Sequence, residues 1–227
     1  MLSLFYPMLK INKIYCIDAI KGLKQLEDEF VDIVLTDPPY GLSKKGISND
    51  EDLRLFYEIL PECYRVLKKD SFFITFFSTK FIPKVFKNNP FQYHWQIVLY
   101  CPNGSVRSSI GYTKFMSIFV FKKGNPKIKK QNKDIFVDSP GRKVEPLEGF
   151  IDHPTPKPTK FIKEILGMFS KEKDLVLDPF IGSGSTALAC KDIKRNFIGF
   201  EINKKYVELA RKRLKRKEKN LINFNSD

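Results

Sequence analysis

The chain has 227 residues, and its 40 Lys and Arg against 26 Asp and Glu give a formal net charge of +14. A chain of this length forms one domain, or one domain with appendages, and buries a core without disulfides or metals. Hydrophobic residues at 42% and charged residues at 29% exclude a mostly disordered chain. No apolar run reaches the roughly 18 residues of a membrane helix, and the N-terminus has no signal-peptide pattern. We therefore expect a cytoplasmic protein without membrane contact, which starts at Met1 or Met8.

The excess positive charge is concentrated in two segments. Residues 122–143 carry eight basic and two acidic side chains, and residues 204–219 carry nine and two. Their net charges of +6 and +7 supply 13 of the 14 excess charges. Such clustering favours a polyanionic partner, usually nucleic acid, although solvated surface lysines give the same composition.

Cysteine and histidine spacing disfavours a metal site. The four cysteines form no CxxC pair, and the chain has only two histidines, at positions 94 and 153. We expect reduced thiols and no bound metal.

Apolar strand-like runs alternate with helix-like patterns along the chain. The expected strands are 14–17, 31–36, 72–77, 96–100, 115–121, 175–177 and 197–200. The expected helices are 19–28, 51–68, 79–87, 157–169, 184–193 and 203–219. This alternation predicts an α/β fold with a mostly parallel, doubly wound sheet, in which 96–100 and 115–121 form an antiparallel hairpin. Residues 122–155 lack periodicity and are typical of a surface excursion or a small subdomain.

A glycine-rich turn follows the expected strand 175–177. Glycines at 182 and 184 permit positive φ and close approach to a ligand, and the helix that follows offers unpaired N–H groups to an anion. Glu201 ends the next strand, 19 residues after Gly182, where an acid can bond ribose hydroxyls. The combination favours a nucleotide site over a plain tight turn, and the missing Walker lysine disfavours an NTPase.

The sequence Asp37-Pro38-Pro39-Tyr40 directly follows the buried strand 31–36. Two prolines fix φ and remove N–H donors, so that the Asp37 carboxylate and the Pro38 carbonyl become two fixed acceptors. Tyr40 adds a flat ring for stacking. An active-site loop is the favoured interpretation, and a rigid loop with a helix-capping aspartate is the alternative.

DPPY together with a separate FxGxG resembles the S-adenosylmethionine-dependent amino-methyltransferases of DNA, which modify adenine N6 or cytosine N4. DPPY precedes the glycine turn here, which is similar to the circularly permuted group called the β class. The resemblance spans about residues 11–217. It implies a Rossmann-like methyltransferase fold as a single domain over 1–227, with S-adenosylmethionine as cofactor and double-stranded DNA as partner. A homodimer and a restriction endonuclease counterpart remain open.

The resemblance also assigns roles to individual residues. It implies that Asp18 and the Ala19 N–H contact the cofactor's adenine, although Asp18 also suits a helix N-cap. Lys157, in a proline-rich segment that equally suits a helix start, is expected at the cofactor carboxylate. The implied catalytic residues are Asp37, Pro38, Pro39 and Tyr40. The remaining implied cofactor contacts are Asp37, Asp178, Phe180, Gly182, Ser183, Gly184, Ser185, Thr186, Glu201 and Ile202.

The implied reaction is methyl transfer to the exocyclic N6 of adenine in a flipped-out base. Asp rather than Ser at the first DPPY position favours adenine, and cytosine N4 is the alternative. An RNA N-methyltransferase and a catalytically silent DNA-binding subunit are less favoured.

Target recognition is expected to be compact. Residues 122–152 are a small basic insertion that could enter a groove with help from the loop 103–111. The expected nucleic-acid contacts are Arg107, Lys127, Lys129, Lys130 and Lys133, with a solvated surface loop as the alternative. In helix 203–219 a packing stripe of Tyr206, Leu209, Ala210, Arg213 and Leu214 leaves a basic face that is more simply solvated.

Overall fold

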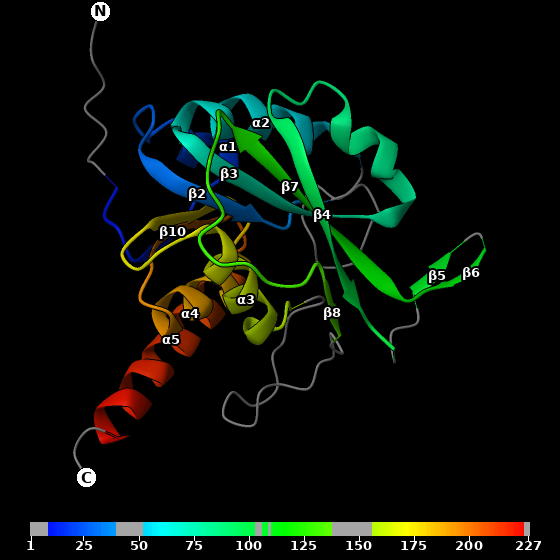
Figure 1. Cartoon of the computed structure of the whole chain (residues 1–227). Helices are drawn as coiled ribbons and strands as arrows, with labels where there is room; N and C mark the ends of the chain where they lie inside the picture. Colours follow the sequence, from blue (N-terminus) through cyan, green and yellow to red (C-terminus); the bar gives the residue numbers. More distant parts are fainter. Residues whose placement is uncertain (1–8, 40–51, 103–105, 109, 138–155, 225–227) are drawn as a thin grey trace, which may run out of the picture.

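The computed structural model describes residues 9–39, 52–102, 106–108, 110–137 and 156–224 (Figure 1). The strands are β1 (Lys13–Cys16), β2 (Val31–Thr36), β3 (Leu67–Phe77), β4 (Gln92–Tyr100), β5 (Val106–Ser108), β6 (Gly111–Thr113), β7 (Phe115–Lys123), β8 (Ile135–Val137), β9 (Leu175–Asp178) and β10 (Asn196–Glu201). The helices are α1 (Ala19–Leu23), α2 (Arg54–Val66), the 3₁₀ segment η1 (Thr79–Phe86), α3 (Thr159–Phe169), α4 (Ser185–Asp192) and α5 (Lys204–Phe224).

Eight strands form one mixed sheet in the order β1-β10-β9-β2-β3-β7-β4-β8. The first five of these run parallel, whereas β7 is antiparallel to both β3 and β4, and β8 runs parallel to β4. The predicted doubly wound α/β sheet is confirmed, as is the antiparallel pairing of the segments 96–100 and 115–121. The parallel strands all end at the same side of the sheet, which is where ligands bind in this architecture.

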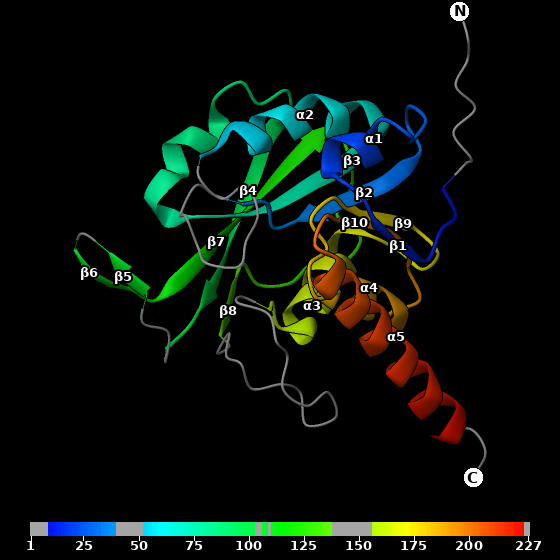
Figure 2. The ribbon, with the colours of Figure 1, turned by 180° about the vertical axis from the view of Figure 1, so that it is seen from behind.

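Helices cover both faces of the sheet (Figures 1 and 2). Strand β3 shows why, because its side chains alternate between two core clusters with a period of two. Phe72, Ile74 and Phe76 join the cluster beneath α3 and α4, and Phe73 and Phe77 join the cluster beneath α1 and α2. A strand with two buried faces reads as a continuous apolar run, so the sequence signal for β2 and β3 is strong.

Several features differ from the sequence prediction. Strands β3 and β4 begin earlier than expected, at Leu67 and Gln92, and the helix expected at 79–87 is the 3₁₀ segment η1. Helix α1 ends at Leu23 rather than near 28. The loop 103–111 contributes to a small hairpin of β5 and β6, which projects from the body in Figures 1 and 2. The expected irregular segment 122–155 contains β8, where only Phe136 of three residues points inward, 5.1 Å from the ring centroid of Phe161. One inward residue gives no recognisable periodicity.

The structure describes the two basic segments only in part. Residues 138–152 of the expected insertion lie outside the described residues. The packing stripe of α5 is confirmed in part: Ala210 and Arg213 are buried and Leu214 packs on the core, whereas Tyr206 and Leu209 are half-buried and the buried Val207 was not expected. Among the described helices, none is both long and apolar enough to cross a bilayer.

Candidate active site

Four acidic side chains lie along the edge where the parallel strands end. Asp18 follows β1, Glu201 ends β10, Asp178 ends β9 and Asp37 follows β2. These strands are sheet neighbours, and Cys16 of β1 is aligned with Glu201 of β10. We call this side of the sheet, defined by the four acids, the carboxyl edge.

Asp37 stands at the end of a strand that is buried on both faces. Pro38 and Pro39 follow it, are buried and have no N–H, so they stop the strand from pairing further. One carboxylate oxygen of Asp37, Oδ2, forms an ion pair with Lys157 Nζ. The other oxygen, Oδ1, is buried and has no hydrogen-bond partner among the described residues.

Lys157 reaches this site from the segment that precedes α3. Its side chain is only 9% exposed, and its ammonium group also lies 5.1 Å from the centroid of the Phe76 ring. The sequence prediction brought Lys157 to the site but gave no indication that it would contact Asp37, 120 residues away. Phe76 was not expected at the site, and its place in an apolar strand carried no signal for it.

Asp178 is a buried acid that organises the glycine turn. It is 4% exposed and accepts hydrogen bonds from Thr186 Oγ1 at 2.6 Å and from Phe180 N–H at 3.1 Å. Burial raises the pKa of Asp178 to about 7, while these two bonds oppose the rise and the charge of Asp37 adds to it. Thr186 therefore directs its hydroxyl to Asp178, inside the protein.

The turn that follows has the backbone that the sequence predicted. Gly182 and Gly184 have φ of 49° and 85°, in the left-handed region. A Cβ on Gly184 would lie 2.8 Å from the Cβ of Ala210 in α5. Only glycine fits there, and the close approach lets α4 begin at Ser185 with its N–H groups at the carboxyl edge.

Arg213 of α5 holds this turn from behind. The side chain is 8% exposed, and its Nη1 donates to the Ser183 carbonyl oxygen at 2.6 Å and to Ser183 Oγ at 3.2 Å. Sequence reasoning placed Arg213 only in the packing stripe. An arginine among the apolar positions of that stripe was the available signal for this role.

The remaining acids flank the turn. Glu201 Oε1 accepts the Asn203 N–H at 2.7 Å, and burial raises the Glu201 pKa against the opposing backbone hydrogen bonds. Asp18 is the N-cap of α1 and accepts the Lys21 N–H at 3.1 Å. Ile202, also expected at the cofactor, is 49% exposed.

Not all expected site residues come together. Tyr40 lies outside the described residues, and so does the side chain of Arg107. The N–H groups of Lys129 and Lys130 donate to the Met168 carbonyl oxygen near the C-terminal end of α3, away from the carboxyl edge. Lys127 lines a hollow with Lys129, and Lys133 contacts the ring of Phe136.

A family model described as DNA methylase, for N6 and N4 methyltransferases, matches residues 31–212. The chain belongs to this family. The type II methyltransferase M2.DpnII of Streptococcus pneumoniae is 32% identical, over 92% of this chain and 92% of its own length.

Solved structures agree with this assignment. The crystal structure of the M1.HpyAVI–SAM complex superposes with a TM-score of 0.70 and 29% identity, covering 89% of this chain and 98% of that one. The cytosine-N4-specific PvuII DNA methyltransferase gives a TM-score of 0.74 at 21% identity, covering 88% and 85%, and shows the shared fold. This DNA methylase therefore has the Rossmann-like methyltransferase fold.

Proposed function

We propose that this methylase transfers a methyl group from S-adenosylmethionine to the exocyclic N6 of adenine in double-stranded DNA. The observation that carries the proposal is the buried Oδ1 of Asp37, an acceptor without a partner among the described residues. It lies at the carboxyl edge, followed by the Pro38 carbonyl and close to Asp178 of the glycine turn. A buried acceptor of this kind calls for a donor, and an amino group supplies two.

The described residues fit S-adenosylmethionine at the same edge. Gly184 keeps the turn free of a side chain, and the N-terminal N–H groups of α4 suit a polar ligand. Glu201 would accept from the ribose hydroxyls, and Asp18 with the Ala19 N–H would hold the adenine. When bound, S-adenosylmethionine supplies an electrophilic methyl group on a positively charged sulfur.

Asp37 and Pro38 would activate the target nitrogen by position. The lone pair of an exocyclic amine is delocalised into its ring, which makes the nitrogen a poor nucleophile. Two fixed acceptors, the carboxylate and the carbonyl, hold its N–H groups and favour a pyramidal nitrogen with its lone pair directed away from them. Positive charge that develops on the nitrogen is stabilised by the adjacent Asp37 carboxylate.

Lys157 makes the two carboxylate oxygens of Asp37 inequivalent. Its ammonium group occupies Oδ2 and so leaves Oδ1 for the target amine. An ammonium group has three donors, so Lys157 can keep this contact and also meet the carboxylate of the cofactor. The nearby Phe76 ring restricts the approach of Lys157 to one side.

A target base must leave the duplex to reach this edge, and we expect Tyr40 to stack on it. The order of DPPY before the glycine turn supports the circularly permuted β class. Adenine is proposed over cytosine because Asp37, rather than serine, stands first in the tetrapeptide.

The reaction is tested by incubating the chain with methyl-labelled S-adenosylmethionine and unmethylated genomic DNA, followed by digestion to nucleosides. We expect the label in N6-methyladenine. Label in N4-methylcytosine would replace the adenine assignment, and label confined to RNA or protein would overturn the choice of substrate.

A further inference from the structure

A second charged feature lies at the other end of the parallel strands. A hollow of about 210 Å³ opens between the amino ends of β2 and β3, the segment after β7 and the turn before β9. We call it the amino-edge hollow. Four exposed lysines from three different segments line it, namely Lys69, Lys127, Lys129 and Lys171.

Three aspartates also line the hollow, and each already accepts a backbone hydrogen bond. Asp32 additionally forms an ion pair with Lys68 at 2.7 Å. The bonds are Leu175 N–H to Asp32 at 2.8 Å, Asn125 N–H to Asp70 at 2.7 Å and Lys171 N–H to Asp174 at 2.9 Å. Asp32 and Asp70 therefore join wall segments that are distant in sequence, and Asp174 closes the local turn before β9.

Unlike Asp32, the four lysines are not tied up in ion pairs among the described residues. Within the described parts of the chain, none of them has an acidic partner within ion-pair distance. With Lys68, the lining carries five lysines against three aspartates, so this concave surface keeps a net charge of +2 and attracts anions. The floor beneath them includes Phe72 and Phe169, whose rings pack 4.8 Å apart, so the hollow rests on the core.

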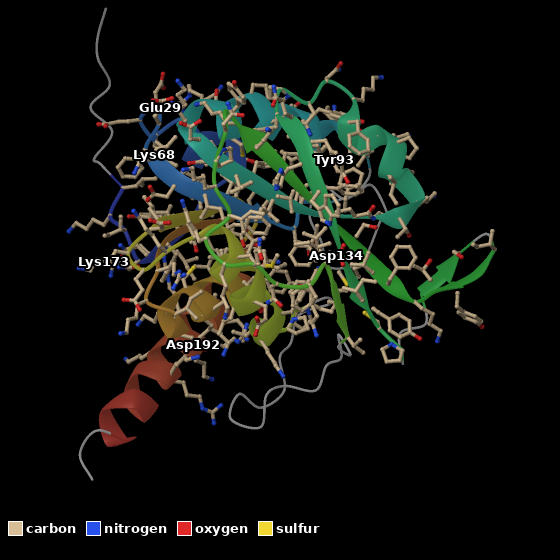
Figure 3. All side chains as sticks on the ribbon, in the orientation of Figure 1. Glu29, Lys68, Tyr93, Asp134, Lys173 and Asp192 are labelled. Atoms are coloured by element: carbon tan, nitrogen blue, oxygen red, sulfur yellow. The ribbon has the colours of Figure 1, made fainter. Side chains whose placement is uncertain are left out.

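The amino-edge hollow faces away from the carboxyl edge. Asp32 and Asp37 are five residues apart on the β2 segment, a span of about 16 Å in an extended strand. In Figure 3, Lys68 and Lys173 lie on the side of the molecule opposite the β5–β6 hairpin. The four lysines therefore lie at the opposite end of the parallel strands from Asp37.

We propose that the amino-edge hollow binds the phosphate backbone of a second stretch of DNA. Lysine suits phosphate as a compact point charge, and four lysines from three segments can each contact a phosphate of the same DNA backbone. The inference takes from the proposed function only that DNA is the substrate. It assigns Lys127 and Lys129 to a contact remote from the target base.

The number of duplexes bound per chain tests this proposal directly. With excess 14-base-pair duplex at low salt, native mass spectrometry should find two duplexes per wild-type chain. The variant K69Q/K127Q/K129Q/K171Q should bind one. Its salt dependence for long DNA should also weaken, with the slope of log K against log salt smaller by about 3 to 4, because roughly 0.9 is lost per phosphate contact.

A matched control removes the same four charges elsewhere. The variant K21Q/K24Q/K84Q/K87Q replaces exposed lysines on α1 and near η1, and it should still bind two duplexes. Equal losses in both variants would show that only net charge matters and would overturn the site. One duplex per wild-type chain would also overturn it.

Two further arms separate the alternatives. Displacement of long DNA from the wild type by submillimolar ATP would assign the hollow to free nucleotides instead of DNA. Methyl transfer to short duplexes should be unchanged in K69Q/K127Q/K129Q/K171Q. If the wild type binds two duplexes but transfers no methyl group, the proposed function fails while the second DNA site stands.

Discussion

Asp37 uses its two carboxylate oxygens differently. Oδ2 faces the Lys157 ammonium group, whereas Oδ1 is buried without a partner among the described residues. A buried acceptor left in this way costs free energy in the unliganded protein, of the order of 1–3 kcal/mol. That cost is recovered when an N–H donor arrives, so the arrangement favours an amino group over a base edge that has no hydrogen-bond donor.

Replacing Lys157 with Met should separate positioning from binding. Methionine keeps the bulk against Phe76 but removes the charge from Oδ2. We expect the single-turnover rate to fall about 100-fold, the scale seen when one preorganised electrostatic contact is lost. The cofactor dissociation constant, measured by calorimetry, should rise less than the rate falls.

The control for this variant is Lys160→Met, at the exposed second residue of α3, which should change neither quantity. Unchanged single-turnover kinetics in Lys157→Met would remove Lys157 from the positioning of Asp37.

Asp178 predicts a pH dependence of stability. Its pKa is about 7 in the folded chain against 3.8 when unfolded, so between these values the folded chain binds the extra proton. The free energy of unfolding should therefore fall as the pH rises from about 4 to about 7, by about 4 kcal/mol at most. Urea unfolding of the wild type and of Asp178→Asn at pH 5 and pH 8 measures this, and the variant should lose the part of the pH slope that Asp178 contributes. Equal slopes would contradict the burial argument.

At the scale of elements, α5 supports the glycine turn. Arg213 donates to the Ser183 carbonyl, and Ala210 lies directly behind Gly184. Arg213→Met should loosen the turn and raise the dissociation constant for S-adenosylmethionine at least tenfold. Lys212→Met, an exposed neighbour on the same helix, is the control and should bind the cofactor normally. Wild-type affinity in Arg213→Met would show that the turn holds its shape without α5.

Element by element, the sequence predicts best where burial is continuous. The predicted strand 31–36 matches β2, since a strand covered on both faces has an unmistakable apolar run. Strands β5, β6 and β8 were missed because three residues contain too few inward positions to show a period. The hairpin pairing of β4 with β7 followed from their short separation in sequence.

Contacts between residues that are far apart in the sequence could not be predicted from local sequence patterns. DPPY and the glycine turn were recognisable as motifs because each is contiguous. The ion pair of Lys157 with Asp37 and the hold of Arg213 on Ser183 join residues far apart in sequence, and no spacing rule links them. The sequence therefore indicated the strand ends that carry the site, and the structure adds the cations that organise it.

At the scale of the whole molecule, charge divides between two edges. The net +14 suggested nucleic acid without saying where it binds. Lys127 and Lys129 were expected to contact DNA, and they line the amino-edge hollow with Lys69 and Lys171. The carboxyl edge instead gathers acids, which suits a cationic methyl donor and an amine. We therefore propose that methyl transfer and the second DNA contact use opposite ends of the parallel strands.

We propose that Asp37 activates an amino group of DNA for methylation. The most direct measurement compares wild type with Asp37→Ala for transfer of labelled methyl from S-adenosylmethionine to unmethylated duplex DNA, with cofactor affinity measured in parallel. We predict label in N6-methyladenine for the wild type, and none above background for Asp37→Ala, whose cofactor dissociation constant stays close to that of the wild type. Full transfer by Asp37→Ala would contradict the account.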